Sequence, residues 1–427
     1  MTASTHHSSL ITHHSYAIDG VMPRRVERPD TPEAVAAHLK SAAEARQAVV
    51  PWGTGTKQGM GNAPRAYDLA LDLTALDQVV EYEPADLVVI VQAGTRLDAL
   101  QRRLAAAGQF LALDPPYAER ATLGGTLATN MSGPSRLLYG TARDLVLGMR
   151  VASPGGDLVK SGGKVVKNVV GYDLNKMHIG GLGTLGVMVE FTLKVHPRPR
   201  AEATVVAGFE SLSAAHAAAG RLSRSVLYLR AVELVRASLP GLPDDSGWRV
   251  LAWAAGSPAT VERQVRDATA WCAEGRAVHT LRLDGEAHAA AWRAVREFGR
   301  DITGEATLLK LTCLPMQVAN LAECVDRFAS EARDAGTAGT APEMVAHAGN
   351  GVLYALLTGA TPALLQRLTG VAVQGGGSAV VERAPAAIRQ QLDVWGPTRG
   401  DFRLMQALKA EFDPHAALNP GRFVGGI

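Results

Sequence analysis

A glycine-rich loop is the feature that most limits how this chain can fold. Val49 and Val50 lead into Pro51–Gly61 (PWGTGTKQGMG), where four glycines fall within nine positions. Glycine accepts positive φ and lets backbone N–H groups approach a ligand without a Cβ in the way. Successive N–H groups in such a turn form a concave anion site, and Lys57 could add a positive charge. We interpret the loop as a cradle for a pyrophosphate, although an ordinary surface turn has the same composition.

A second segment of similar character lies further along the chain. Thr122–Pro134 (TLGGTLATNMSGP) is rich in glycine and hydroxyl side chains and offers little that could pack as core. The rigid turn Asp114-Pro115-Pro116 comes just before it. Two loops of this kind suggest that both line one ligand. The alternative is two unrelated turns.

Strands and helices alternate around the first loop. Thr31-Pro32-Glu33 predicts a helix start, because threonine caps well, proline suits the first turn and glutamate favours the positive end. Leu87–Val91 is a β-prone run that predicts a strand. Thr95, with Asp98 three residues later, predicts the N-cap of a helix that Gly108 ends. The first hundred residues therefore predict an α+β or α/β domain.

A third glycine motif argues against a Rossmann-type site. Gly181–Gly186 (GLGTLG) has the form GxGxxG, but the dinucleotide fingerprint requires a helix after it. Here Val187–Val195 alternates with period two, which predicts a strand. Leu145–Val159 predicts a β-hairpin around a Ser-Pro-Gly-Gly turn. The loop at 51–61 also lacks P-loop spacing.

The remainder of the chain predicts a second, smaller α+β domain. His196–Pro199 (HPRP) punctuates the sequence like a domain boundary, and residues 200–345 are richer in alanine and arginine. Helices are predicted at about 211–224, 258–274, 286–299, 315–334 and 400–412, and strands at 203–208, 231–235, 249–254 and 308–312. The strands look antiparallel.

Composition excludes several classes of function. A hydrophobic content of 47 % supports a sizeable core, and a net charge of +2 excludes the strongly basic surface of a nucleic-acid or membrane-surface protein. Three cysteines make neither a disulfide framework nor a metal cluster. No apolar run approaches the length of a transmembrane helix and no signal peptide is evident. We expect a cytoplasmic protein without direct membrane insertion.

These pieces, in this order, resemble the FAD-linked oxidases of the vanillyl-alcohol oxidase superfamily, which have a bipartite, PCMH-type FAD-binding domain. The pieces that carry the resemblance are 51–61, 122–134, Tyr139-Gly140, 145–160, 183–187 and 413–422. The resemblance implies an α+β fold. In it, residues 1–22 are a flexible tail, 23–199 form the FAD-binding domain and 200–345 an α+β cap. Residues 346–427 complete the cap and return to the FAD domain.

Two further runs resemble the FAD-binding subunits of bacterial glycolate oxidases. They are Lys164–Lys176 (KVVKNVVGYDLNK) and Leu392–Gly396 (LDVWG). This resemblance implies a paralogous flavoprotein subunit and an iron–sulfur subunit as partners, oxidation of glycolate and D-lactate to the 2-oxo acid, and membrane association only through partners. The alternatives are a self-sufficient FAD-dependent D-2-hydroxyacid dehydrogenase and an interaction subunit that has lost its flavin.

The same resemblance implies a set of cofactor-binding residues. The pyrophosphate would be held, mostly through backbone N–H groups, by Gly53, Thr54, Gly55, Thr56 and Lys57. The ribityl and isoalloxazine side would be lined by Pro115, Thr122, Gly124, Gly125 and Thr126, with Ser132 and Gly133 continuing that wall. Val187 would contact the adenine half, and the cap would cover the reactive face of the flavin.

One departure from the family pattern concerns metal binding. Related 2-hydroxyacid dehydrogenases carry a His-x-Gly-Asp-Gly-Asn-x-His motif that supplies metal ligands and a polar group near the flavin. Here the stretch reads His347–Tyr354 (HAGNGVLY), with Asn350, Val352 and Tyr354 replacing the Asp, the Asn and the second His. Valine and tyrosine do not make such a metal site, so we expect no metal.

Two side chains remain as catalytic candidates. His347 is the retained histidine of that motif, although a lone histidine is often a hydrogen-bonded structural residue. Lys310, on the strand predicted at 308–312, could face the flavin and attract a carboxylate, or it could be solvated. The altered motif favours a supporting, electron-transferring role for this chain.

Overall fold

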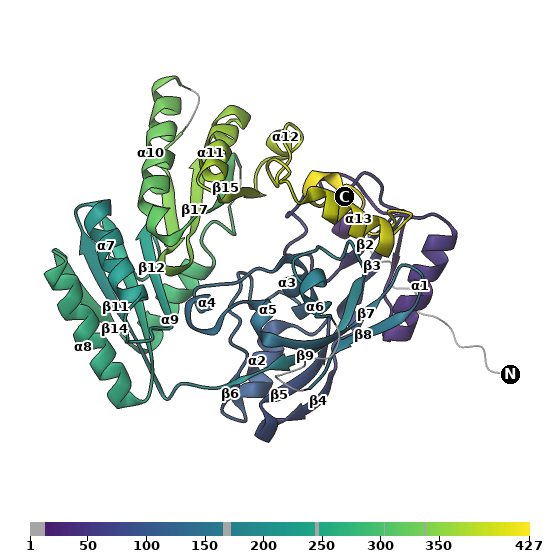
Figure 1. Ribbon diagram of the computed structural model, residues 1–427, viewed down its shortest axis with the longest axis horizontal. Coiled ribbons are helices and arrows are strands. Elements are labelled where there is room, and N and C mark those ends of the chain that lie inside the picture. Colours follow the sequence, from purple (N-terminus) through teal and green to yellow (C-terminus); the bar gives the residue numbers. More distant parts are fainter. Residues whose placement is uncertain (1–12, 165–171, 244–246, 303, 337–338) are drawn as a thin grey trace.

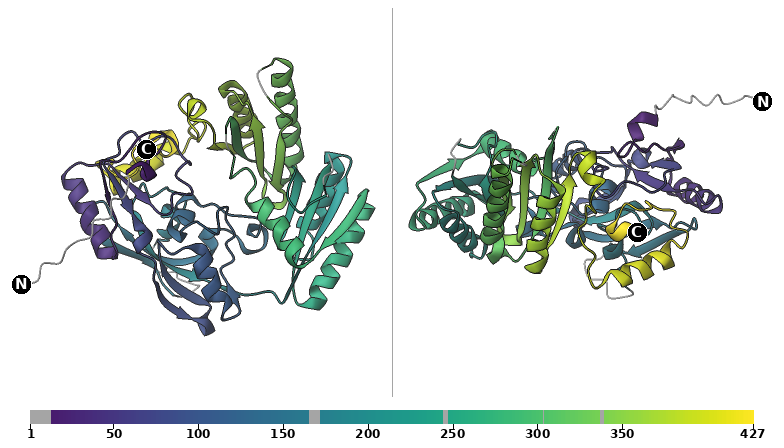
Figure 2. Two further views of the ribbon diagram at one scale, coloured as in Figure 1. Left: turned by 180° about the vertical axis from the view of Figure 1, so that it is seen from behind. Right: turned by 90° about the horizontal axis from the view of Figure 1, so that it is seen from above.

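The computed structural model describes residues 13–164, 172–243, 247–302, 304–336 and 339–427. Residues 165–171, which form most of the Lys164–Lys176 motif, lie outside the described part. The chain forms two halves that lie side by side, and the C-terminal segment crosses from the second half back to the first (Figures 1 and 2).

A small parallel sheet carries the glycine loop. It has the order β1 (Arg25–Glu27), β3 (Leu69–Asp72), β2 (Val49–Trp52). Helix α1 (Pro32–Glu44) packs against it and begins as predicted, with Thr31 accepting a hydrogen bond from the Ala34 N–H and Pro32 in the first turn. The loop therefore starts at the end of a buried strand.

A five-stranded antiparallel sheet completes the first half. Its order is β4 (Val79–Glu83), β5 (Val88–Gln92), β9 (Val187–Lys194), β7 (Val146–Ala152), β8 (Leu158–Gly162). The hairpin β7–β8 and the strand after the GxGxxG motif confirm two predictions. A two-stranded sheet joins β6 (Gln109–Phe110) to β10 (His196–Pro197) at the boundary between the halves.

The prediction that Thr95 caps a helix is wrong. Helix α2 (Leu97–Ala105) has Arg96 at its N-cap, and Asp98 pairs with Arg96 instead of completing a capping box. Residues 95–97 pair with 121–123 through backbone hydrogen bonds. Because that pairing holds Arg96 in an extended conformation, the helix cannot begin earlier.

The expectation of a loop at Thr122–Pro134 is also wrong for its first part. Leu123–Thr129 forms helix α3, with Thr122 as the N-cap accepting from the Gly125 N–H. Leu123 and Leu127, four residues apart, are fully buried and supply the apolar face. Short helices follow at α4 (Arg136–Tyr139), α5 (Ala142–Leu145) and α6 (Asn175–His178).

An eight-stranded antiparallel sheet forms the second half. Its order is β14 (His279–Leu283), β11 (Ala201–Phe209), β13 (Trp248–Gly256), β12 (Ala231–Arg236), β16 (Glu343–His347), β17 (Val352–Thr358), β15 (Ala306–Thr312), β18 (Ser378–Arg383). The antiparallel arrangement was predicted, whereas β14 and the last three strands in sequence were not. Strands on both sides of residue 345 share this sheet.

Helices cover both faces of the large sheet. Helices α7 (Leu212–Ser223), α8 (Pro258–Glu274), α10 (Val318–Asp334) and α11 (Pro362–Gln374) share one core cluster with it. Helix α9 (Gly285–Arg296) packs in a separate cluster with Trp253 and Leu251. The remaining short turns are η1 (His13–Tyr16), η2 (Leu73–Ala75), η3 (Pro84–Asp86), η4 (Pro315–Gln317), η5 (Ala348–Asn350) and η6 (Val424–Gly426).

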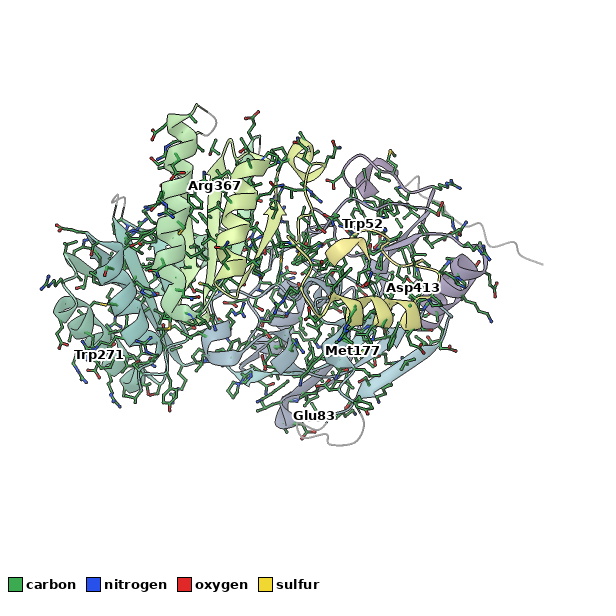
Figure 3. All side chains as sticks on the ribbon, turned by 45° about the horizontal axis from the view of Figure 1, so that its top comes forward. Trp52, Glu83, Met177, Trp271, Arg367 and Asp413 are labelled. Atoms are coloured by element: carbon green, nitrogen blue, oxygen red, sulfur yellow. The ribbon has the colours of Figure 1, made fainter. Side chains whose placement is uncertain are left out.

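The C-terminal segment ties the chain back to the glycine loop. After α12 (Ala386–Arg389), helix α13 (Phe402–Phe412) lies on the first half, and Leu418 pairs with Val49 of β2 (Figure 1). The buried Lys409 amine donates to Asp413, 2.7 Å away, and to two backbone carbonyls. Figure 3 shows Asp413 on this side of the molecule, together with Trp52.

Several polar contacts link the halves. Both carboxylate oxygens of Glu297 accept from the Tyr117 N–H, at 3.0 and 2.9 Å. Arg230 of the large sheet donates to the Ser135 hydroxyl at 2.8 Å. These contacts join the second half to segments before and after α3. Within the described residues, no helix is long and apolar enough to cross a membrane.

Candidate functional site

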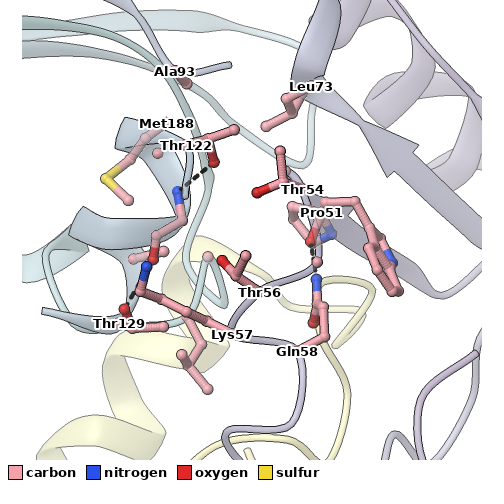
Figure 4. A pocket seen from close by; sticks show the side chains of 18 of the residues that line it. Pro51, Thr54, Thr56, Lys57, Gln58, Leu73, Ala93, Thr122, Thr129 and Met188 are labelled. Atoms are coloured by element: carbon pink, nitrogen blue, oxygen red, sulfur yellow. Dashed lines mark hydrogen bonds between the residues drawn. The ribbon is translucent and has the colours of Figure 1, made fainter. Parts of the chain in front are cut away.

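The glycine loop, α3 and the chain before β9 line one cleft of about 730 Å³ (Figure 4). Of the residues expected to bind a cofactor, this cleft brings together Gly53, Thr54, Gly55, Thr56, Lys57, Thr122, Gly124, Gly125 and Val187. The two glycine-rich segments therefore face one another across one space.

Close backbone approach explains the glycines. A Cβ on Gly53 would lie 2.2 Å from the Thr122 hydroxyl oxygen, and one on Gly124 would lie 2.9 Å from the Ala93 Cβ. Gly55 has φ +75°, and a Cβ there would lie 2.8 Å from Trp52 Cζ3. A larger residue at position 53 would separate the loop from the N-cap of α3, one at 124 would push α3 away from Ala93, and one at 55 would displace the loop from Trp52.

Residues from the far end of the chain hold the loop in place. Arg422, which is buried, donates to the backbone carbonyls of Gln58 and Met60 at 2.6 and 2.8 Å. The Gln58 side chain donates to the Pro51 carbonyl at 2.9 Å. Arg422 ends the segment 413–422, which the sequence identified only as part of a family resemblance. In the structure its guanidinium binds the backbone of the glycine loop.

The Lys57 side chain points away from the loop. Its amine is 3.3 Å from the Thr126 hydroxyl and 5.7 Å from the centre of the Tyr117 ring. Burial lowers the pKa of Lys57 to about 7, and the positive charge of Arg300 adds to the decrease. Thr126 does not line the cleft. Its hydroxyl contacts the amine of Lys57, which does line the cleft.

Two further cavities lie between the first half and the large sheet. A polar chamber of about 570 Å³ shares Gly55–Lys57 with the cleft and is also lined by Tyr117, Arg300 and Glu382. A third cavity of about 250 Å³ lies between Ser132–Pro134 on one side and Arg300, His347 and Tyr354 on the other. Arg300 lines both, so the three spaces form one row that ends at His347.

The predicted flavin wall is divided between these spaces. Ser132 and Gly133 line the third cavity rather than the cleft, and Pro115 lines none of the three. A Cβ on Gly133 would lie 1.9 Å from the Asp114 carbonyl oxygen. The segment after α3 therefore packs against the Asp-Pro-Pro turn and faces the large sheet.

His347 is buried and paired with a carboxylate. Its Nδ1 is 2.8 Å from each oxygen of Glu233, on the neighbouring strand β12. Burial raises the pKa of Glu233, and the adjacent His347 opposes that increase. The Tyr354 ring is nearly perpendicular to the imidazole, and the two ring centres are 5.6 Å apart. No group of three or more potential metal ligands occurs among the described residues.

Lys310 lies outside the row of cavities. Its amine is 3.8 Å from Glu382, a buried carboxylate that forms an ion pair with Arg300. Arg383, the next residue, donates to the Tyr117 hydroxyl at 2.8 Å and to the Arg300 carbonyl at 2.6 Å. Of these two cations, Arg300 lines the cavities and Lys310 does not.

Comparison with known families agrees with this geometry. Residues 23–162 match the FAD binding domain family, and residues 198–378 and 393–423 match the C-terminal domain of FAD linked oxidases. The chain belongs to the FAD-linked oxidases. Its cofactor is accordingly FAD, and as an FAD-linked oxidase it is an oxidoreductase.

Several relatives of this FAD-linked oxidase are named for their activity. It is 27% identical to glycolate oxidase subunit GlcD of Bacillus subtilis over 94% of this chain and 89% of that protein. It is 38% identical to glycolate oxidase subunit GlcE of Escherichia coli over 40% of this chain and 49% of that protein. It is 34% identical to a mitochondrial D-lactate dehydrogenase (cytochrome) of Saccharomyces cerevisiae over 50% and 36% of the two chains.

A solved structure of alkyldihydroxyacetonephosphate synthase shares the fold. The TM-score is 0.71 at 19% identity, covering 94% of this chain and 78% of that one. The α+β, PCMH-type architecture predicted from the sequence is thereby confirmed.

The described residues of this FAD-linked oxidase fit the cofactor. The cleft presents a glycine backbone that no Cβ obstructs and a buried amine that makes no ion pair with any described carboxylate. Sequence reasoning missed Arg422, Arg300 and Glu233. Only Glu233 had a local signal, since it is a single carboxylate inside the apolar strand Ala231–Arg236.

Proposed function

We propose that this chain is the FAD-binding subunit of a glycolate oxidase complex, where it supports oxidation of glycolate and D-lactate to the 2-oxo acid through flavin-mediated electron transfer. The similarity to both the GlcD and the GlcE subunits supports the assignment. We further propose a paralogous flavoprotein subunit and an iron–sulfur subunit as partners. In this proposal the protein is cytoplasmic and reaches the inner membrane only through them.

The observation that carries the proposal is a set of polar groups around the third cavity. The Arg300 Nε and the Ser132 hydroxyl are buried and have no hydrogen-bond partner among the described residues. Both residues line the cavity together with His347. Unpaired buried donors are costly, so a ligand with acceptor oxygens is expected there. A 2-hydroxy acid offers both a carboxylate and a hydroxyl.

Each of these residues would have a separate role in binding or oxidising such a substrate. Bound FAD supplies the acceptor for the two electrons and the Cα hydrogen. Arg300 would hold the substrate carboxylate through its free Nε–H, because a guanidinium is suited to that geometry. Nδ1–H of His347 donates to Glu233, which leaves Nε2 as an acceptor for the proton of the substrate hydroxyl. Ser132 would orient that hydroxyl.

A second candidate is a self-sufficient FAD-dependent D-2-hydroxyacid dehydrogenase. The pairing of His347 with Glu233 favours it, because this pairing provides a base without a metal. A flavin-free interaction subunit is the third possibility, and the unobstructed glycine cleft argues against it.

One purification separates these candidates. The chain is produced alone and together with its neighbouring subunits, and the flavin per chain and the turnover of glycolate with a dye acceptor are measured for both preparations. One FAD per chain, with turnover only in the assembled complex, supports the proposed function. Turnover by the isolated chain assigns the dehydrogenase. Absence of flavin after added FAD overturns both.

An Arg300→Lys variant tests the substrate cavity within the same experiment. Lysine keeps the charge opposite Glu382 but loses the Nε–H. Turnover in the complex should fall at least tenfold if this chain binds substrate. Unchanged turnover would show that the 2-hydroxy acid is oxidised on another subunit.

A further inference from the structure

Three other buried cations of this chain each have a carboxylate partner, whereas no described carboxylate forms an ion pair with Lys57. Arg300 pairs with Glu382, Lys409 with Asp413 at 2.7 Å, and Arg230 with Glu202 at 2.8 Å. Lys57 is 9 % exposed, and among the described residues its amine has one hydrogen-bond partner, the Thr126 hydroxyl.

The surroundings of the amine have an excess of positive charge. Arg300 and Arg383 line the polar chamber beside it, and Glu382, the carboxylate of that chamber, is neutralised by Arg300 and Lys310. Glu297 is the acidic group whose charge favours the protonated amine, but its carboxylate is bound to the Tyr117 N–H. A buried ammonium in such a place is unfavourable until an anion joins it.

The direction of the side chain indicates which part of the cofactor that anion is. The glycine loop lines the cleft, whereas the Lys57 amine extends to Thr126 and Tyr117, where the cleft meets the polar chamber. That junction is the end of the cleft nearest to Arg300 and the large sheet. An anionic group at that junction, rather than one in the centre of the glycine loop, would therefore lie beside the Lys57 amine.

We propose that Lys57 stabilises the negative charge of two-electron-reduced FAD and so raises the reduction potential of this subunit. Reduction follows FAD + 2 e⁻ + H⁺ → FADH⁻, so the ring system gains one negative charge. With a 2-hydroxy acid as reductant the balance is R–CHOH–COO⁻ + FAD → R–CO–COO⁻ + FADH⁻ + H⁺. The proposal rests on FAD as the cofactor and not on which subunit binds substrate.

A pyrophosphate contact would behave differently. The pyrophosphate carries the same charge in oxidised and reduced FAD, so an amine bound to it would strengthen cofactor binding without favouring either redox state. Only a charge near the ring system changes the equilibrium between them. The two roles of Lys57 are therefore separable by measurement.

The test compares purified holoprotein of the wild type with Lys57→Met, Lys57→Gln and Lys57→Arg. Methionine and glutamine remove the charge at similar length, and arginine keeps it. Lys160→Met, at an exposed position on β8, removes one positive charge far from the cleft. FAD content is measured by absorbance after denaturation, and the midpoint potential by equilibration with redox dyes at pH 7.

Lys57→Met and Lys57→Gln should retain FAD and have midpoint potentials lower by about 30 mV or more, which corresponds to a tenfold weaker two-electron reduction equilibrium. Lys57→Arg and Lys160→Met should stay at the wild-type value. Wild-type potentials in both neutral variants would overturn the proposal. Loss of FAD, with a wild-type potential in the reconstituted fraction, would do so as well and would assign Lys57 to the pyrophosphate.

Discussion

Replacing Gly55 by valine should abolish FAD retention while leaving the rest of the protein folded. Gly55 has φ +75° and lies in the tightest part of the loop that lines the cleft. A β-branched residue is strained at positive φ, and its Cβ would also lie 2.8 Å from Trp52 Cζ3. Trp52 is buried, so the loop must shift rather than the ring.

The size of the effect follows from the torsional strain at positive φ and from the clash with Trp52. The left-handed conformation costs a residue with a Cβ about 1–2 kcal/mol. The clash with Trp52 adds to that cost, and together they oppose the binding conformation by about 2 kcal/mol or more. A difference of 2 kcal/mol corresponds to about thirtyfold weaker FAD binding.

The assay is FAD retention after gel filtration, followed by titration with FAD and a thermal melt of the apoprotein. Gly108→Val is the matched control, because Gly108 also has a positive φ of +67°, but a Cβ there would meet no described atom within 4 Å. It should lose stability from the torsional strain and keep its flavin. Stoichiometric FAD in Gly55→Val would refute the placement of the cofactor in this cleft.

Three further predictions follow from single side chains. His347→Asn should lower kcat for 2-hydroxy acid oxidation by about 10²- to 10⁴-fold with FAD retained, provided that this chain binds substrate; steady-state kinetics and flavin content check it. Lys409→Met removes the one cation paired with the buried Asp413 among the described residues, leaving that carboxylate only backbone N–H donors, and should destabilise the fold by about 3–5 kcal/mol in urea unfolding. Folding of the FAD-free protein lowers the pKa of Lys57 from 10.5 to about 7, so between pH 7 and 10.5 the unfolded chain binds more protons than the folded chain. The free energy of unfolding should therefore rise with pH across that range, and it should rise less in Lys57→Met.

The fold was predictable where local pattern and final structure agree. Period-two runs predicted β7 and β9, and Thr31-Pro32 predicted the start of α1. The glycine loop predicted an anion site from its own residues, without showing which distant residues contact the loop. The misplaced cap at Thr95 shows the limit, because backbone pairing with residues 121–123 overrides the local capping preference.

The parts of the site that sequence could not provide depend on distant residues. Arg422 holds a loop whose residues Gln58 and Met60 lie more than 360 positions earlier. Arg300 follows the end of α9 and was not distinguished from other arginines of an arginine-rich segment. Its importance arises from burial beside Glu382 and from an unpaired Nε, and neither property has a local sequence signature.

The altered histidine motif gains a more specific meaning from these contacts. Loss of the second histidine suggested a chain that holds flavin without oxidising substrate. In the structure the retained His347 has a carboxylate partner in Glu233, and Tyr354 packs its ring against the imidazole and lies 5.2 Å from the Arg300 guanidinium. A side chain thus occupies the place where the motif of related enzymes would supply a second metal ligand, and the acid–base pair beside it is intact. Two features of this chain are therefore separate: the second histidine of the metal-binding motif is replaced, whereas His347 and Arg300 still line the cavity. Turnover by the isolated chain, and its dependence on Arg300 and His347, decides whether they still act on a substrate.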